Sequence, residues 1–129
     1  MASGKLSLDG LGKYLEDLAA AGKDVDAAAK KALPIGGEII ARQMRTLVPK
    51  DTHHLEDTIG VEGPNQDGNF IYVDVGVITG DKETAIYGNV QEYGSSSVEA
   101  QPYIRPSFRS RKAAAMRAMK QSLESDGML

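Results

Sequence analysis

One short segment, Asp51 to Asp57, carries the residue types that could bind a metal ion or act as catalytic bases. It places two adjacent histidines, His53 and His54, among acidic side chains. Neighbouring side chains on a strand point to opposite faces, so the two histidines could share an ion only from a loop. The chain has no cysteine and no second histidine cluster to complete a tetrahedral site. A polar entrance to a strand is the favoured interpretation, and we expect no bound metal.

The serine run Ser95 to Ser97 is the other candidate for chemistry, because a serine with His53 or His54 could form part of a hydrolytic triad. However, the chain has no Gly-x-Ser-x-Gly elbow, no phosphate-binding Gly-x-x-x-x-Gly-Lys-Ser/Thr loop and no Gly-x-Gly-x-x-Gly turn. Three consecutive serines are more typical of a flexible loop. We therefore expect no enzymatic activity and no cofactor. Metal-dependent hydrolysis through the two histidines is kept as a third hypothesis.

The C-terminal segment is basic, although the whole chain has a net charge of −3. On a helix, Arg105, Arg109 and Lys112 share one face, with Lys120 nearby. Such cations can form a solvated face that also suits the C-terminal half of a helix. They can equally contact phosphate or an acidic neighbour. Sequence-specific reading of bases is not expected, because no aromatic residue lies between Arg109 and Lys120 to stack on them. The predicted contacts with DNA or an acidic partner are Arg109, Arg111, Lys112, Arg117 and Lys120.

A rigid corner precedes this basic segment. Pro102 and Pro106 bracket Tyr103, Ile104 and Arg105. Each proline fixes its own backbone and biases the residue before it toward an extended conformation. This corner could be a helix entry with a hydrophobic staple. Alternatively, it could present a fixed patch to another subunit, since tyrosine and arginine are favoured interface anchors.

The N-terminal part of the chain is predicted to be helical over about residues 8–47. A first helix is expected to stop at Gly22, and Asp24 is expected to cap a second. The apolar stripe of the second helix keeps its phase across Pro34, which predicts one kinked helix with the proline toward solvent. Two helices, the second opening at Pro34, are the alternative. The apolar stripe of the first predicted helix comprises Leu8, Leu11, Leu15 and Leu18.

Beyond Pro49 the apolar pattern changes to strand-like alternation, with strands expected within about residues 55–93. The alternation begins at Leu55, and a turn-rich segment at Gly63–Gly68 indicates a hairpin. In the segment after this turn, the alternation predicts a strand with Ile71, Val73, Val75 and Val77 on one face. Residues 84–94 could form a third strand, and a helical turn that breaks this strand is the alternative. A C-terminal helix is predicted over about 104–124. The chain thus reads as one domain, 1–129, of the α+β class, with a small antiparallel sheet of about three strands packed against the long N-terminal helix and the C-terminal helix.

The sequence lacks an N-terminal signal peptide and any apolar stretch of the roughly 18 residues typical of a membrane span. We expect no contact with a membrane. A sheet this small has two edges, and an edge strand can pair with another chain.

Three blocks of the sequence resemble the tail-component proteins of HK-type and lambdoid bacteriophages, the tail-completion or head–tail joining group. They are "VPKDTHHLEDTI" (residues 48–59), "AIYGNVQEYGSS" (85–96) and "AQPYIRPSF" (100–108). The resemblance extends over about residues 28–114. It departs from the family pattern at His53, where the family often has glycine, and mildly at Thr58 and Ser95.

This resemblance implies a virion structural protein without catalysis or cofactor. Subunits of the family form a ring, usually a hexamer, between the head–tail connector and the tail tube, so the implied partners are copies of the chain and the connector, tail tube and terminator proteins. Genomic DNA would pass through the lumen without sequence-specific contact. The implied location is the neck or tail top of the virion, with assembly in the host cytoplasm. The alternative is a small DNA-binding module that acts through the basic C-terminal helix.

On this interpretation, the proline-bounded corner and its neighbours would dock adjacent subunits. We expect loops around 50–55 and 95–101 to become ordered on assembly. The predicted interface residues are Asp51, Thr52, Leu55, Glu92, Tyr93, Gly94, Pro102, Tyr103, Arg105 and Pro106.

Overall fold

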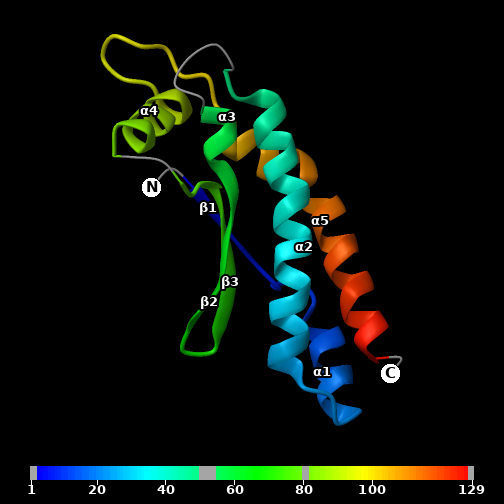
Figure 1. Cartoon of the computed structure of the whole chain (residues 1–129). Coiled ribbons are helices and arrows are strands. Elements are labelled where there is room, and N and C mark those ends of the chain that lie inside the picture. Colours follow the sequence, from blue (N-terminus) through cyan, green and yellow to red (C-terminus); the bar gives the residue numbers. More distant parts are fainter. Residues whose placement is uncertain (1–2, 50–54, 80–81, 128–129) are drawn as a thin grey trace.

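A computed structural model of the chain describes residues 3–49, 55–79 and 82–127 (Figure 1). Three strands and five helices follow one another along these residues. In chain order they are β1 (Ser3–Ser7), α1 (Gly12–Ala20), α2 (Val25–Leu47), α3 (Leu55–Thr58), β2 (Ile59–Asp67), β3 (Phe70–Val77), α4 (Lys82–Tyr93) and α5 (Ile104–Gly127).

The three strands form one antiparallel sheet in the order β1-β3-β2, with β3 in the centre. Alternation along β3 sends Val73, Val75 and Val77 to one face, where they are fully buried, and Tyr72 and Asp74 to the other. α2 packs against β2 and β3 on the buried face, and α5 packs along α2 (Figure 1). The predicted α+β class, with a small sheet against a long helix and a C-terminal helix, is confirmed.

The long helix α2 passes through Pro34 without interruption, as the unbroken phase of its apolar stripe predicted. Asp24 caps its start by accepting a hydrogen bond from the backbone N–H of Ala27 at 3.1 Å. Pro34 itself is half-buried rather than fully turned to solvent. The adjacent Gly36 and Gly37 are buried where α2 approaches α5 and the sheet most closely. A Cβ on Gly36 would lie 2.7 Å from the side chain of Met119 in α5, so these small residues permit the tight packing.

The N-terminal prediction is wrong in two respects. The helix expected from Leu8 begins only at Gly12, and the preceding residues 3–7 form β1, for which we predicted no strand. Leu8 and Leu11 are buried although both lie outside the helix. Gly22, with φ of +75°, does end this region as expected. The N–H of Lys23 bonds the carbonyl of Leu18 at 2.9 Å, as in a Schellman-type stop.

Two segments in the middle of the chain also differ from prediction. Leu55 begins the short helix α3 instead of a strand, and residues 82–93 form helix α4 instead of a third strand. The hairpin is confirmed, but β2 continues through Gly63–Gly68 as far as Asp67, with a register irregularity between Glu62 and Asn65. None of the helices in the described residues is long and apolar enough to span a membrane.

Candidate functional site: the junction between α4 and α5

The three sequence blocks that carry the family resemblance meet around the side chain of Tyr103. Leu55 from the first block is fully buried there, and Gly88 from the second lies against both residues. Tyr103, from the third block, is itself 0% exposed. Residues about fifty positions apart in the chain thus build one junction, which fixes α4 and the start of α5 relative to the end of β3.

The carboxylate of Glu92, near the end of α4, caps the start of α5. Its Oε1 accepts the backbone N–H groups of Tyr103 at 2.8 Å and Ile104 at 2.6 Å, and its Oε2 accepts that of Arg105 at 3.0 Å. The first turn of a helix leaves four N–H groups without intrahelical partners. Pro106 has no N–H, so one side chain satisfies every donor of this turn. A negative charge is also favourable at this end of the helix.

Arg105 completes the charge balance at the same carboxylate. Its Nε donates to Glu92 Oε2 at 2.7 Å, and its NH2 group donates to the Glu92 backbone carbonyl at 2.9 Å. Burial alone would raise the pKa of the Glu92 carboxyl. The hydrogen bonds from Arg105 and from the three backbone N–H groups outweigh that effect, so the pKa lies below its ordinary value. Glu92 is therefore held as a buried, fully hydrogen-bonded carboxylate.

Tyr103 closes the junction from the other side. Its hydroxyl donates to the carbonyl of Gly88 at 3.0 Å, and its own carbonyl accepts the hydroxyl of Ser107. Gly88 permits this approach, because a Cβ there would lie 2.9 Å from the Tyr103 hydroxyl and 3.0 Å from Val77. Burial, followed by the charge of Glu92, raises the pKa of Tyr103 well above its ordinary value. The phenol is thus a neutral hydrogen-bond donor and a core side chain.

Gly94 ends α4 with φ of +79°, a conformation that favours glycine, and its N–H bonds the carbonyl of Val90 at 2.7 Å. The chain then leaves the domain as an exposed loop, residues 95–100, and returns where the N–H of Gln101 bonds the carbonyl of Gln91 at 2.7 Å. Figure 1 shows this loop projecting beside α4 at one end of the molecule. The loop therefore has a fixed base and an exposed tip.

The outer surface of the junction is apolar and aromatic. Tyr93 is 60% exposed, and the guanidinium carbon of Arg105 lies 4.9 Å from the centre of its ring. Ile86, about two turns before Tyr93 on the same face of α4, is 55% exposed, and Val98 in the loop is 42% exposed. Only Gly88, Gln91 and Glu92 of α4 are buried. We call Ile86, Tyr93, Val98 and Arg105 the α4 surface.

The predicted interface residues therefore fall into two groups. Leu55, Glu92 and Tyr103 are buried inside the subunit and hold the junction together. Five others have exposed surface, wholly or in part, and their role in an interface stays a prediction: they are Tyr93, Gly94, Pro102, Arg105 and Pro106. Asp51 and Thr52 lie outside the described residues, as do His53 and His54. Among the residues that are described, no group of three or more His, Cys, Asp or Glu side chains could hold a metal ion.

The predicted basic contacts do not share one surface. Arg109 and Lys112 line a groove between α5 and β1. Arg111 lies on the opposite flank, where its Nε donates to Gln43 of α2 at 3.2 Å. Lys120 lies over the ring of Tyr14 at 5.3 Å, with Glu124 at 4.0 Å, and Arg117 is exposed. A single contact through all five cations is not supported by this arrangement.

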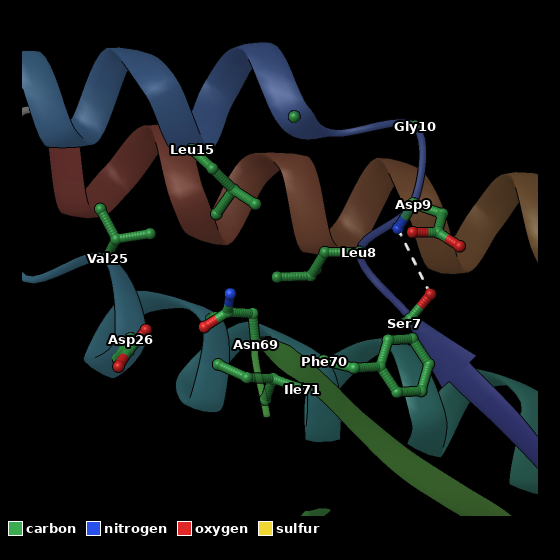
Figure 2. Close-up of a pocket in the computed structure, with 12 residues that line it drawn as sticks. Ser7, Leu8, Asp9, Gly10, Leu15, Val25, Asp26, Asn69, Phe70 and Ile71 are labelled. Carbon is green, nitrogen blue, oxygen red and sulfur yellow. Dashed lines mark hydrogen bonds between the residues drawn. The ribbon is translucent and has the colours of Figure 1, made fainter. Parts of the chain in front are cut away.

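A separate hollow of about 310 Å³ lies at the far end of the sheet, between α1, the start of α2 and the β2–β3 turn (Figure 2). Its walls are mainly apolar, from residues such as Leu8, Leu15 and Val25, and Asp9 and Asp26 lie at its margin. Ligand sites commonly combine an apolar wall with a few convergent polar groups. In Figure 2 the two carboxylates do not converge on one point, and the one hydrogen bond drawn joins the Asp9 N–H to the Ser7 hydroxyl.

Sequence reasoning singled out Glu92 but did not find its role as a helix cap, and it missed Gly88, Ile86 and Val98 altogether. A signal for the cap was available. Tyr103, the residue before α5, cannot serve as an N-cap, so the helix needed an acceptor from elsewhere in the chain. The nearest acid upstream that is followed by a helix-ending glycine is Glu92.

The chain was compared with the models of known protein families. Residues 9–94 match the model of the family HK97-gp10_like, described as "Bacteriophage HK97-gp10, putative tail-component". The match includes the first block and the second as far as Gly94, and it ends before the third. Searches of curated proteins and of solved structures found no significant match. Since the match covers about two-thirds of the chain, the protein belongs to the HK97-gp10-like family of phage tail components, which supports a structural role in the virion.

Proposed function

We propose that this protein is a head–tail joining subunit that assembles into a ring, a hexamer, between the connector and the tail tube. Membership of a tail-component family supports a virion structural role. The observation that carries the finer proposal is the α4 surface, where Ile86 and Tyr93 are more than half exposed on a helix that buries few of its own residues. Contiguous exposed apolar surface is typical of an interaction site, and Ile86 and Tyr93 lie about two turns apart on the same face of α4.

The Glu92 cap gives this surface a fixed orientation. A ring closes only when every copy meets its neighbour at the same angle. The carboxylate joins the end of α4 to the first turn of α5 through four hydrogen bonds and fixes Arg105 beside Tyr93. The proline-bounded corner would therefore set the docking angle between subunits, without catalysis or cofactor. Tyrosine and arginine are the residue types that most often anchor such contacts.

Phage particles that lack this protein test the proposal. We expect complete heads and complete tails that remain separate, and we expect joining to be restored when the protein is supplied. Particles that are fully joined and infectious without it would contradict the proposal. The ring is proposed to assemble in the host cytoplasm and to act in the neck of the virion, with DNA passing through its lumen.

The second candidate function, DNA binding through α5, is favoured by one observation. Arg109 and Lys112 are exposed on the same flank of α5, and neither forms an ion pair with any described residue. Phosphate contacts would make duplex binding fall steeply with salt. Tight, salt-dependent binding of duplex DNA by the isolated subunit would favour this function over the ring.

A further inference from the structure

A groove of about 380 Å³ runs between β1 and α5. One wall is formed by three consecutive residues of β1, Lys5, Leu6 and Ser7, and the other by Phe108, Arg109 and Lys112 on successive turns of α5. Consecutive residues of a strand point to opposite faces of the sheet. A groove that contacts all three must therefore run along an edge of the strand.

That edge is the unpaired edge of β1. The other edge of β1 is occupied by β3, with Lys5 opposite Asp74 and Leu6 opposite Val73. An edge strand presents backbone N–H and C=O groups on which another strand can pair. The second sheet edge, on β2, is less open. Its backbone carries the Gly63–Pro64 irregularity, and the carbonyl of Ile59 is already bonded by Arg45 at 3.0 Å.

The α5 wall of the groove is positively charged and would favour an acidic ligand. Arg109 and Lys112 are exposed and make no ion pair with the residues that the structure describes. Lys5, by contrast, is already paired with Asp74 at 3.1 Å and lies over the ring of Tyr72. A segment that adds to β1 would therefore find two available cations on its open side, and an acidic side chain would complement them.

An extended peptide fits this groove better than a nucleic acid does. Asp9 lines the same groove and would repel a phosphate and an acidic side chain alike, so the choice of a peptide rests on the strand edge. The free edge of a strand presents backbone N–H and C=O groups at the repeat of an extended peptide. A strand that pairs there lies about 4.8 Å from the first. Strand addition to an exposed edge is an established mode of peptide recognition.

The chain itself contains a segment of matching chemistry in the exposed loop beside α4. Residues 98–100 read Val-Glu-Ala. The side chain of Val98 is 42% exposed, and Glu99 is exposed. The backbone groups of Glu99 and Ala100 form no hydrogen bond with the described residues, so they are available for pairing. Val98 is bonded within the loop, since its carbonyl accepts the N–H of Ser95 at 2.9 Å and its N–H donates to the Ser95 hydroxyl at 3.1 Å, so its pairing requires this turn to open. The segment 98–100 has three residues, and three residues of β1 line the groove.

We propose that Val98–Ala100 of one subunit adds as a short strand to the free edge of β1 in the next subunit, with Glu99 facing Arg109 and Lys112. This inference rests on the proposed ring, and it names the two surfaces that meet. The contact is heterologous, since the loop and the groove are different surfaces of the chain, and such contacts generate rings when the rotation closes.

Disulfide trapping tests this contact directly, because the chain contains no cysteine. A Glu99→Cys chain is mixed with an Arg109→Cys chain under oxidising conditions. We expect a covalent dimer that contains one chain of each kind. The matched control mixes Glu99→Cys with Arg117→Cys, since Arg117 is also an exposed arginine of α5 but lines neither of the two grooves that Arg109 and Arg111 line. Equal trapping in the two mixtures, or no trapping of Arg109→Cys in a sample shown to be oligomeric, overturns the inference.

Charge reversal provides a second readout. Glu99→Lys, and separately Arg109→Glu with Lys112→Glu, are expected to raise the concentration needed for half-assembly by about tenfold or more, and the triple variant is expected to recover most of that loss. If the unmodified protein forms a ring and these variants assemble as it does, the strand contact is wrong while the proposed function stands. If the unmodified protein never forms an oligomer, alone or with connector and tail-tube proteins, the ring itself is wrong.

Discussion

The carboxylate of Glu92 and the guanidinium of Arg105 form an ion pair of 2.7 Å in which the acid is fully buried and the base is 52% exposed at its side chain. The buried partner also caps α5 through three backbone N–H groups. The exposed partner lies on the ring of Tyr93. One ion pair therefore links the interior of the subunit to the α4 surface.

Replacing Glu92 by glutamine should destabilise the subunit. The change keeps the size of the side chain but removes the charge that accepts four hydrogen bonds, and an uncharged amide offers only one acceptor oxygen. We expect the free energy of unfolding to fall by about 2–4 kcal/mol, measured by urea denaturation. The matched control is Glu99→Gln, an exposed acid, with an expected change within about 0.5 kcal/mol. Equal stability of Glu92→Gln and the unmodified protein would contradict the capping role.

The same carboxylate predicts the pH dependence of stability. Its folded pKa lies below the ordinary value of 4.5, so between these two pKa values the unfolded chain binds more protons than the folded one. The stabilisation by Glu92 is therefore fully present above about pH 4.5 and is lost as the pH falls through the folded pKa. Urea titrations from pH 7 to pH 3 should show the stability difference between the unmodified protein and Glu92→Gln shrinking below about pH 4.5. A constant difference across this range would contradict the lowered pKa.

The two tyrosines at the junction should behave in opposite ways. Tyr103→Ala empties a fully buried site and should cost the subunit about 3–5 kcal/mol. Tyr93→Ala removes an exposed ring with one cation contact and should cost the subunit less than about 1 kcal/mol, yet weaken assembly by about 1–3 kcal/mol. Denaturation of the subunit and concentration-dependent mass measurement separate the two effects. Normal assembly of Tyr93→Ala would remove Tyr93 from the interface.

Gly88→Ala should destabilise the protein, although alanine is the better helix former by about 1 kcal/mol. The new Cβ would lie 2.9 Å from the Tyr103 hydroxyl and 3.0 Å from Val77, and overpacking of this kind typically costs about 1–3 kcal/mol. Combining the change with Tyr103→Phe should recover part of the loss, because the closest atom is removed. The control is Gly12→Ala in α1, where no atom lies within 4 Å of the added Cβ. Equal effects at Gly88 and Gly12 would contradict the close packing.

The parts of the fold that the sequence predicted are those with regular, local patterns. The apolar stripe of α2 continues on both sides of Pro34, and the alternation in β3 places Val73, Val75 and Val77 on one face; both predictions agree with the structure. Long amphipathic helices and alternating strands carry their own burial pattern, so their identity depends little on distant residues.

The errors concern elements that owe their structure to distant partners. β1 has the sequence SGKLS, with one apolar residue, and it is a strand because it pairs with β3, as in Lys5 opposite Asp74. α4 contains β-branched and aromatic residues typical of strands, including Ile86 and Val90. It is a helix whose inner side bears Gly88 and Glu92, against Tyr103. Neither pairing follows from local periodicity.

Only part of the candidate site was predictable, because its contacts also join residues that are distant in the sequence. The family resemblance identified the blocks that contain Glu92 and Tyr103, but it did not indicate that these residues hydrogen-bond each other inside one subunit. That relationship depends on how the chain returns from Gly94 to Gln101, which is set by two backbone hydrogen bonds of 2.7 Å.

Mass measurement of the purified protein under native conditions, alone and with the connector and tail-tube proteins, tests the central claim most directly. The account predicts a closed ring of six copies that needs a higher protein concentration to form when Tyr93 is replaced by alanine. A protein that remains a monomer in every mixture, at all concentrations that keep it folded, would contradict the claim that it works by docking against copies of itself.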